Sequence, residues 1–102
     1  MPTNSAQAAG GTPPAALQVS CVQMHWAKPL AFNLERTLHY IGAAARAGSR
    51  VVLFPEASLT SYYFPYAVGL DPAEVQAALE TVQAEARARG IWVIAGTIRK
   101  TR

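Results

Sequence analysis

The sequence has little charge, and its few charges form no basic face. Asp, Glu, Lys and Arg make up 15% of the 102 residues, whereas an average soluble domain has about 25%. The formal net charge is +3, and its excess is scattered apart from Arg99, Lys100 and Arg102. Because nucleic-acid binding usually needs a basic face or stripe, we expect no nucleic-acid partner. We also expect part of this weakly charged surface to be covered, either by further sequence or by a partner subunit.

Cysteine is nearly absent, and long apolar runs are missing. The single cysteine, Cys21, excludes an internal disulfide, which fits a reducing compartment. Its place inside an apolar run favours a buried structural thiol over a nucleophile. No apolar run approaches the ~18 residues of a membrane span, and the N-terminus has neither the basic start nor the apolar core of a signal peptide. We therefore expect no membrane partner and a cytoplasmic location.

Phosphate-binding and metal-binding patterns are also lacking. The loop at residues 25–29 contains no glycine, so a phosphate-cradling turn of the G-x-G-x-x-G kind is absent. His25 has no second His, Cys or acid at ligand spacing, which favours a role in loop packing over metal binding. The sequence thus predicts no metal site.

The chain divides into a leader and one α/β segment. After the first methionine, residues 1–16 contain only Ala, Gly, Pro, Ser, Thr, Asn and Gln, which predicts a disordered leader. Residues 17–102 alternate apolar strand patterns at 17–24, 51–54 and 91–96 with helical patterns at 33–47 and 72–89. The first strand is apolar on both faces, which favours a central, covered strand. The order β-α-β-α-β, with right-handed crossovers, predicts a parallel sheet.

Both helices carry recognisable end signals. Asn33 is a plausible N-cap of the first helix, and Gly48 stands where a left-handed C-terminal residue is expected. Asp71, Pro72 and Glu74 predict the start of the second helix, with Asp71 as its N-cap, and Gly90 ends it. The expected buried stripes are Leu34, Leu38, Ile41 and Ala45 in the first helix, and Val75, Leu79, Val82 and Ala86 in the second.

The candidate catalytic residue is Glu56, at the end of Val51-Val52-Leu53-Phe54-Pro55-Glu56. Pro55 cannot donate a ladder hydrogen bond, so the strand ends there. Glu56 is thereby placed just beyond the carboxyl end of a strand, where ligands bind in open α/β sheets. A carboxylate between an apolar strand and an aromatic loop is partly desolvated and suits general-base chemistry. The alternative is an ordinary solvated loop glutamate.

An aromatic loop follows at residues 61–70. Tyr62, Tyr63 and Phe64 could line a substrate pocket, or they could pack the loop onto the body of the protein. The sequence leaves both possibilities open. We take Tyr62 and Tyr63 as candidate substrate-binding residues because they follow Glu56 closely.

The ordered set of these segments resembles the N-terminal part of the nitrilase, or carbon–nitrogen hydrolase, superfamily, over roughly residues 17–99. The segments that carry the resemblance are, in chain order, Gln23-Met24, Asn33, Ala43-Ala44-Ala45-Arg46-Ala47-Gly48, Val51-Val52-Leu53-Phe54-Pro55-Glu56, Leu59-Thr60-Ser61-Tyr62, Gly90-Ile91, Val93-Ile94 and Ala95-Gly96-Thr97. The resemblance implies a four-layer α-β-β-α sandwich, of which this chain supplies the N-terminal β-α-β-α-β part.

The resemblance also implies a Glu-Lys-Cys catalytic set that hydrolyses amides, nitriles or carbamoyl compounds, without a metal or organic cofactor. Glu56 matches the glutamate, the general base that takes the thiol proton. The cysteine forms a covalent thioester, and the lysine stabilises the charge that develops at the tetrahedral centre. The expected partner is a small-molecule amide, nitrile or carbamoyl substrate.

The chain departs from the family pattern at the other two catalytic positions. The family's lysine and cysteine follow the third strand, beyond Arg102, whereas Lys100 comes too soon after that strand and Cys21 precedes Glu56. Ser61 stands where the family often has glycine. We expect residues 17–102 to be a truncated domain without hydrolase activity alone, with one sheet face uncovered and therefore homo-oligomeric or poorly soluble.

Two other interpretations remain. The chain could be a non-catalytic fragment that is truncated or pairs with a fuller relative. It could instead be a small nucleotide-binding α/β module, although the missing glycine loop argues against this.

Overall fold

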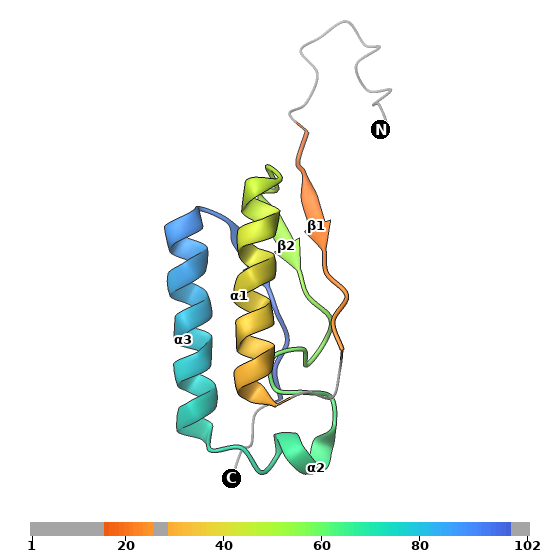
Figure 1. Cartoon of the computed structure of the whole chain (residues 1–102), viewed down its shortest axis with the longest axis vertical. Helices are drawn as coiled ribbons and strands as arrows, with labels where there is room; N and C mark the ends of the chain where they lie inside the picture. The colour runs from red at the N-terminus through yellow and green to blue at the C-terminus, as the bar shows by residue number, and fades with distance from the viewer. Residues whose placement is uncertain (1–15, 26–28, 99–102) are drawn as a thin grey trace, which may run out of the picture.

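The chain folds around a short parallel sheet, as the computed structural model shows for residues 16–25 and 29–98 (Figure 1). The strands are β1 (Val19–Cys21), β2 (Val51–Leu53) and β3 (Trp92–Ile94), in the order β1-β2-β3. Both pairings are parallel, so the predicted α/β class and parallel topology are confirmed. The predicted leader, apart from Ala16, lies outside the described residues.

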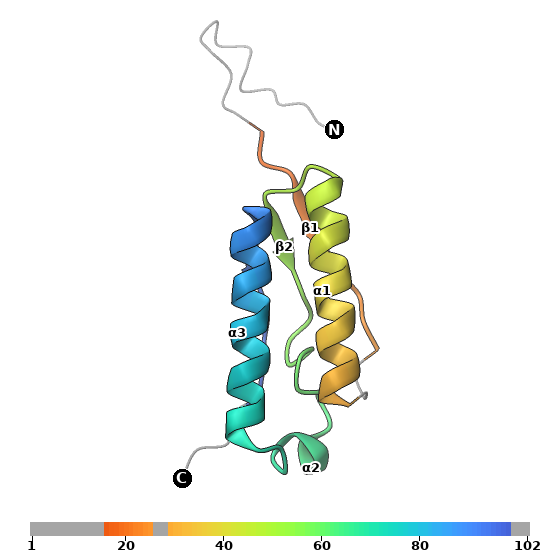
Figure 2. The ribbon, with the colours of Figure 1, turned by 60° about the vertical axis from the view of Figure 1, so that its left-hand side comes forward.

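Two long helices cover one face of this sheet. Helix α1 (Leu30–Arg46) and helix α3 (Pro72–Arg89) pack against each other and against the strands, and Figures 1 and 2 show them side by side on the same side of the sheet. The short helix α2 (Phe64–Ala67) lies at the carboxyl end of the strands. Crossovers of one hand place consecutive helices on one face of a sheet whose strands follow chain order.

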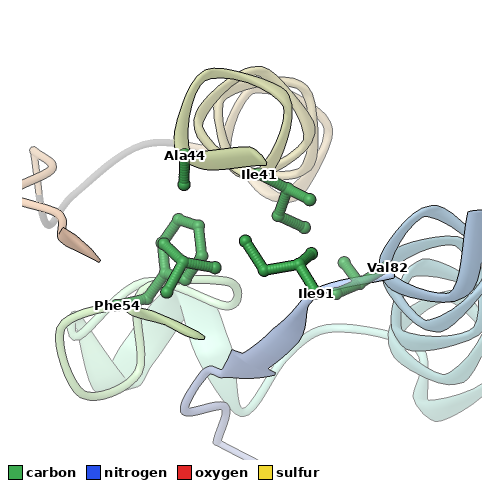
Figure 3. Close-up of a cluster of buried hydrophobic side chains, with 6 residues drawn as sticks. Ile41, Ala44, Phe54, Val82 and Ile91 are labelled. Carbon is green, nitrogen blue, oxygen red and sulfur yellow. The ribbon is translucent and has the colours of Figure 1, made fainter. Parts of the chain in front are cut away.

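The core lies between the helices and the sheet. Val52, on the middle strand, is fully buried, and Phe54 is 5% exposed. In Figure 3, Ile91 lies between Ile41 of α1 and Val82 of α3, and Phe54 lies below Ala44. The predicted stripe of α3 is nearly correct, because Val75 and Val82 are buried, although Ala78 rather than Leu79 is the third buried residue.

Three of the four ends of the long helices α1 and α3 follow their sequence signals. The Asp71 carboxylate accepts a hydrogen bond from the Ala73 N–H at 3.0 Å, which caps the start of α3. Gly48 and Gly90 follow α1 and α3 with φ angles of 93° and 64°, the left-handed conformation that glycine adopts without strain.

The predicted N-cap at Asn33 is wrong. Helix α1 begins at Leu30, with Pro29 in the capping position. Asn33 lies in the first turn of the helix with its side chain fully buried. Its Nδ2 donates to the Leu59 carbonyl at 3.1 Å, so this amide serves a tertiary contact rather than the end of its own helix.

The predictions that the first strand is central and that Cys21 is buried are also wrong. β1 stands at one edge of the described sheet, beside β2 alone, and Cys21 is exposed. The register explains this, because Cys21, Leu53 and Ile94 are partners across the three strands and share a face with Val19 and Trp92. That face points away from α1 and α3, on the opposite side from the buried Val52.

We call these five residues, Val19, Cys21, Leu53, Trp92 and Ile94, the open sheet face. Trp92 is 75% exposed, Ile94 56% and Leu53 41%. No described residue covers them. Among the described residues, moreover, no helix has the length and apolar character needed to cross a membrane.

Candidate active site

Glu56 lies where the central strand ends, at the carboxyl edge of the sheet. Phe54 makes the last contact of this strand with its neighbour, through its N–H to the Ile94 carbonyl at 2.9 Å. Pro55 then ends the pairing, as its missing N–H predicts. Glu56 therefore lies where the sequence predicts it, just beyond the carboxyl end of a parallel strand.

The carboxylate of Glu56 faces solvent. Glu56 is exposed, so the partial desolvation expected from its apolar neighbours is not found among the described residues. Its side chain makes no hydrogen bond or ion pair within that part of the chain. A carboxylate in this state can accept a proton from a group that approaches from outside the described fold.

The turn that follows Glu56 is, in contrast, buried. Ala57, Ser58, Leu59, Thr60 and Ser61 are each 8% exposed or less; we call residues 55–61 the Glu56 turn. Loops normally run over the surface, so a buried turn must have its backbone groups satisfied by other elements. The Glu56 turn is accordingly a rigid part of the core that presents one exposed carboxylate.

Two residues of the Glu56 turn have left-handed backbone conformations that glycine normally supplies. Ala57 has a φ angle of 56° and Ser61 one of 82°. Such angles cost free energy in a residue with a Cβ atom, of the order of 1 kcal/mol or more. Ser61 offsets part of this by accepting a hydrogen bond from the Tyr63 N–H at 3.1 Å. Ser61, noted above as a departure from glycine, thus adopts a left-handed conformation that glycine accommodates more easily.

Two separate segments hold the Glu56 turn. Asn33 of α1 donates to the Leu59 carbonyl at 3.1 Å. The segment after β3 contributes twice, through the Gly96 carbonyl, which accepts from the Leu59 N–H at 3.4 Å, and through the Ile98 N–H, which donates to Thr60 Oγ1 at 2.8 Å. Next to this contact, the buried hydroxyls of Ser58 and Thr97 have no hydrogen-bond partner within residues 16–25 and 29–98.

Tyr62 and Tyr63 lie beside this turn, and only part of each side chain is covered by other residues. They are 51% and 53% exposed, and Phe64 is 59% exposed. The aromatic residue that does pack is Tyr66, whose hydroxyl accepts from the Leu30 N–H at 2.8 Å and so joins the start of α1 to α2. Both roles left open for Tyr62 and Tyr63, pocket lining and loop packing, stay predictions, because each side chain is about half exposed.

Cys21 is not brought to Glu56 as a paired nucleophile. It lies on the open sheet face, as the partner of Leu53 on β2. A hollow of about 400 Å³ where β1 and β2 end is lined by Cys21, Val22, Gln23, Met24, Leu53, Phe54 and Pro55. His25 is exposed, and no group of three or more His, Cys, Asp or Glu side chains that could hold a metal ion exists among the described residues.

Sequence reasoning found Glu56 but missed the residues that support it. Asn33 was assigned to a helix end, and Gly96 was noted only as part of a family segment. A polar residue within a buried helical stripe was the available signal for Asn33, while a glycine at the end of an apolar strand pattern was the signal for Gly96.

Of the comparisons with known proteins, the one with family models gave a match. The model of the family described as carbon-nitrogen hydrolase matches residues 18–102. No curated protein and no solved structure matched the chain. The matched range contains all three strands, both long helices and the Glu56 turn, and it covers well over half of the sequence. The chain therefore belongs to the carbon-nitrogen hydrolase family.

Proposed function

We propose that Glu56 is the general base of a carbon–nitrogen hydrolase that acts on amides, nitriles or carbamoyl compounds. The observation that carries this proposal is the position of Glu56, an exposed carboxylate on a buried turn at the carboxyl end of the central strand. Such a base must be held rigidly while its carboxylate stays accessible to the group that it deprotonates.

In the proposed reaction Glu56 removes the proton from a cysteine thiol. The thiolate attacks the substrate carbon, and a lysine ammonium stabilises the negative charge of the tetrahedral species. For an amide, the protonated Glu56 passes the thiol proton to the leaving nitrogen, and the collapse of this species releases ammonia or an amine and leaves a thioester. Glu56 then deprotonates the water that hydrolyses the thioester, which releases the acid and the free thiol.

The cysteine and the lysine of this set are proposed to come from residues outside the printed sequence. Cys21 lies on the open sheet face, and Lys28 and Lys100 lie outside the described residues. We propose that residues 17–102 are the N-terminal part of a four-layer α-β-β-α sandwich, whose second sheet would cover the open sheet face. On this proposal the 102 residues alone do not turn over substrate.

The substrate would approach the exposed edge of the sheet near Tyr62 and Tyr63. Both side chains are about half exposed, so they are available to form an apolar wall beside Glu56. We propose them as substrate-binding residues; aromatic rings supply large contact areas at low entropic cost.

The first experiment is the intact mass of the polypeptide purified from its native host, followed by assays with amide, nitrile and carbamoyl substrates. A mass well above 10.9 kDa together with turnover supports the proposal. In that polypeptide Glu56→Gln should reduce kcat by at least about a thousandfold, or ~4 kcal/mol of transition-state stabilisation, with an unchanged fold by circular dichroism.

The matched control is Glu35→Gln, an exposed glutamate on α1, which should leave turnover unchanged. Turnover near the wild-type value in Glu56→Gln would show that Glu56 is not the base.

The alternative is a non-catalytic fragment that is partner-dependent. One observation favours this alternative. Cys21 lies exposed on the open sheet face, so it supplies no nucleophile beside Glu56. A native mass of 10.9 kDa without turnover on any substrate class would support it over the hydrolase.

A further inference from the structure

Gly96 lies closer to Glu56 than any side chain would allow. A Cβ atom at Gly96 would lie 2.7 Å from the Ala57 nitrogen and 3.2 Å from the Glu56 Cα. Real Cβ atoms essentially never approach backbone atoms to 2.7 Å. The chain leaving β3 therefore contacts the backbone of the Glu56 turn directly, and only a glycine fits between them.

We propose that Gly96 is a positioning residue for Glu56, fixing where the carboxylate stands at the edge of the sheet. This inference rests on the proposed role of Glu56 and adds the residue that sets its place. Gly96 acts through the backbone of Glu56 and Ala57 and not through substrate.

The contact is reinforced on both sides along the chain. Two residues before Gly96, the Ile94 carbonyl accepts from the Phe54 N–H. At Gly96 itself, the carbonyl accepts from the Leu59 N–H, and two residues later the Ile98 N–H donates to Thr60. The segment 94–98 thus follows residues 54–60 over their whole length, and Gly96 lies opposite Glu56 and Ala57.

The left-handed conformation of Ala57 links this contact to the direction in which the chain leaves Glu56. With a φ angle of 56°, Ala57 has an unfavourable backbone geometry that persists only when its surroundings impose it. Gly96 stands directly against the Ala57 nitrogen and is part of these surroundings. Relaxation of this contact would change the direction in which the chain leaves Glu56.

The test is Gly96→Ala in the full 102-residue chain carrying ¹³C-labelled glutamate. The chain has five glutamates, and Glu56→Gln identifies the Glu56 carboxyl resonance by its disappearance. Gly96→Ala should shift that carboxyl resonance and the Ala57 amide, while Glu35, Glu74, Glu80 and Glu85 keep their positions. An unshifted Glu56 resonance in the folded variant overturns the proposal.

The matched control is Gly42→Ala on α1, a second glycine where an added Cβ atom would meet close neighbours. A Cβ atom there would meet the ends of the Arg46 and Arg89 side chains at 3.2 Å, and these can move aside. The Glu56 resonance should not respond to Gly42→Ala. An equal response to both substitutions would show that Glu56 reports general packing changes, which also overturns the proposal.

If Gly96→Ala does not fold, Thr60→Val replaces it as the test. Valine keeps the shape of threonine but removes the oxygen that accepts from the Ile98 N–H, so the segment after β3 loosens without a steric clash. The Glu56 resonance should shift here too, and no shift would reject the proposed role of this segment. Neither readout needs turnover. A lack of turnover in the polypeptide purified from the native host would therefore count against the proposed hydrolase but not against the positioning.

Discussion

A single buried amide connects α1 to the turn that carries the candidate base. Asn33 is fully buried, and its Nδ2 donates to the Leu59 carbonyl, 26 residues later in the chain. The Thr37 hydroxyl donates to the Asn33 carbonyl at 2.7 Å, which places a second buried polar group beside the first. An unmade hydrogen bond in the interior costs more free energy than the made bond contributes, so loss of the bond between Asn33 and Leu59 should destabilise the fold.

Asn33→Ala should therefore lower the free energy of unfolding by about 1–3 kcal/mol, the usual cost of leaving a buried polar group without its partner. Urea unfolding, followed by circular dichroism at one fixed protein concentration, measures this difference. Gln83→Ala, an exposed polar position on α3, is the control and should change stability by no more than about 0.5 kcal/mol. Equal losses in the two variants would contradict the buried role of Asn33.

At the scale of the elements, the helix of the second crossover shows what local sequence can specify. Asp71, Pro72 and Gly90 lie at the positions that their chemistry predicts, and α3 begins and ends accordingly. Its capping bond joins the Asp71 carboxylate to the Ala73 N–H, two residues away. Signals of this kind are satisfied within one turn of chain, so they do not depend on the rest of the fold.

Asp71→Ala should lower the free energy of unfolding by about 1 kcal/mol, because it removes this N-cap acceptor. Asp71→Asn is the matched control, since an amide oxygen can accept the same bond from Ala73. The two variants are compared by thermal unfolding at equal concentration. A loss as large in Asp71→Asn as in Asp71→Ala would mean that the charge, and not the cap, stabilises α3.

The elements that sequence reasoning misplaced are those whose environment is set by distant residues. Asn33 has the chemistry of an N-cap, yet its partner is Leu59, so a local signal was outweighed by a tertiary hydrogen bond. Apolar residues on both faces of the first strand predicted a covered central strand, whereas β1 is at the edge and one of its faces is open. The period-2 pattern of a strand shows which residues share a face but not what covers that face.

The features of the candidate site also divide into those set by local sequence and those set by distant residues. The position of Glu56 followed from Pro55 and the apolar strand before it, both of which are local. The left-handed angle at Ala57 and the residues that Gly96 contacts could not be predicted from local patterns, because they arise where two segments about 40 residues apart meet. The roles of Tyr62 and Tyr63 remain predictions.

At the scale of the whole molecule, the dominant feature is a sheet that the described residues cover on one side only. The helices bury Val52, whereas the open sheet face leaves Trp92 75% and Ile94 56% exposed. Parallel sheets are normally covered on both faces, and contiguous exposed apolar patches mark sites of association. Either further sequence or a second copy of the chain would cover this face.

For the 102-residue chain by itself, we predict self-association through the open sheet face. Leu53→Lys places a charge on the central strand of this face, where burial against a second molecule would strip the ammonium of water. Since Leu53 is already 41% exposed, folding should be little affected. The dissociation constant should rise at least tenfold, equivalent to about 1.4 kcal/mol, in sedimentation equilibrium.

Val68→Lys is the control for this prediction, because Val68 is 45% exposed but follows α2, away from the open sheet face. It should leave the dissociation constant unchanged, and a tenfold effect there would mean that association uses another surface. A wild-type chain that sediments as a monomer at every accessible concentration would contradict the prediction altogether. In a longer native polypeptide whose own residues cover this face, Leu53→Lys should instead lower the free energy of unfolding, because the same charge would then be buried within one molecule.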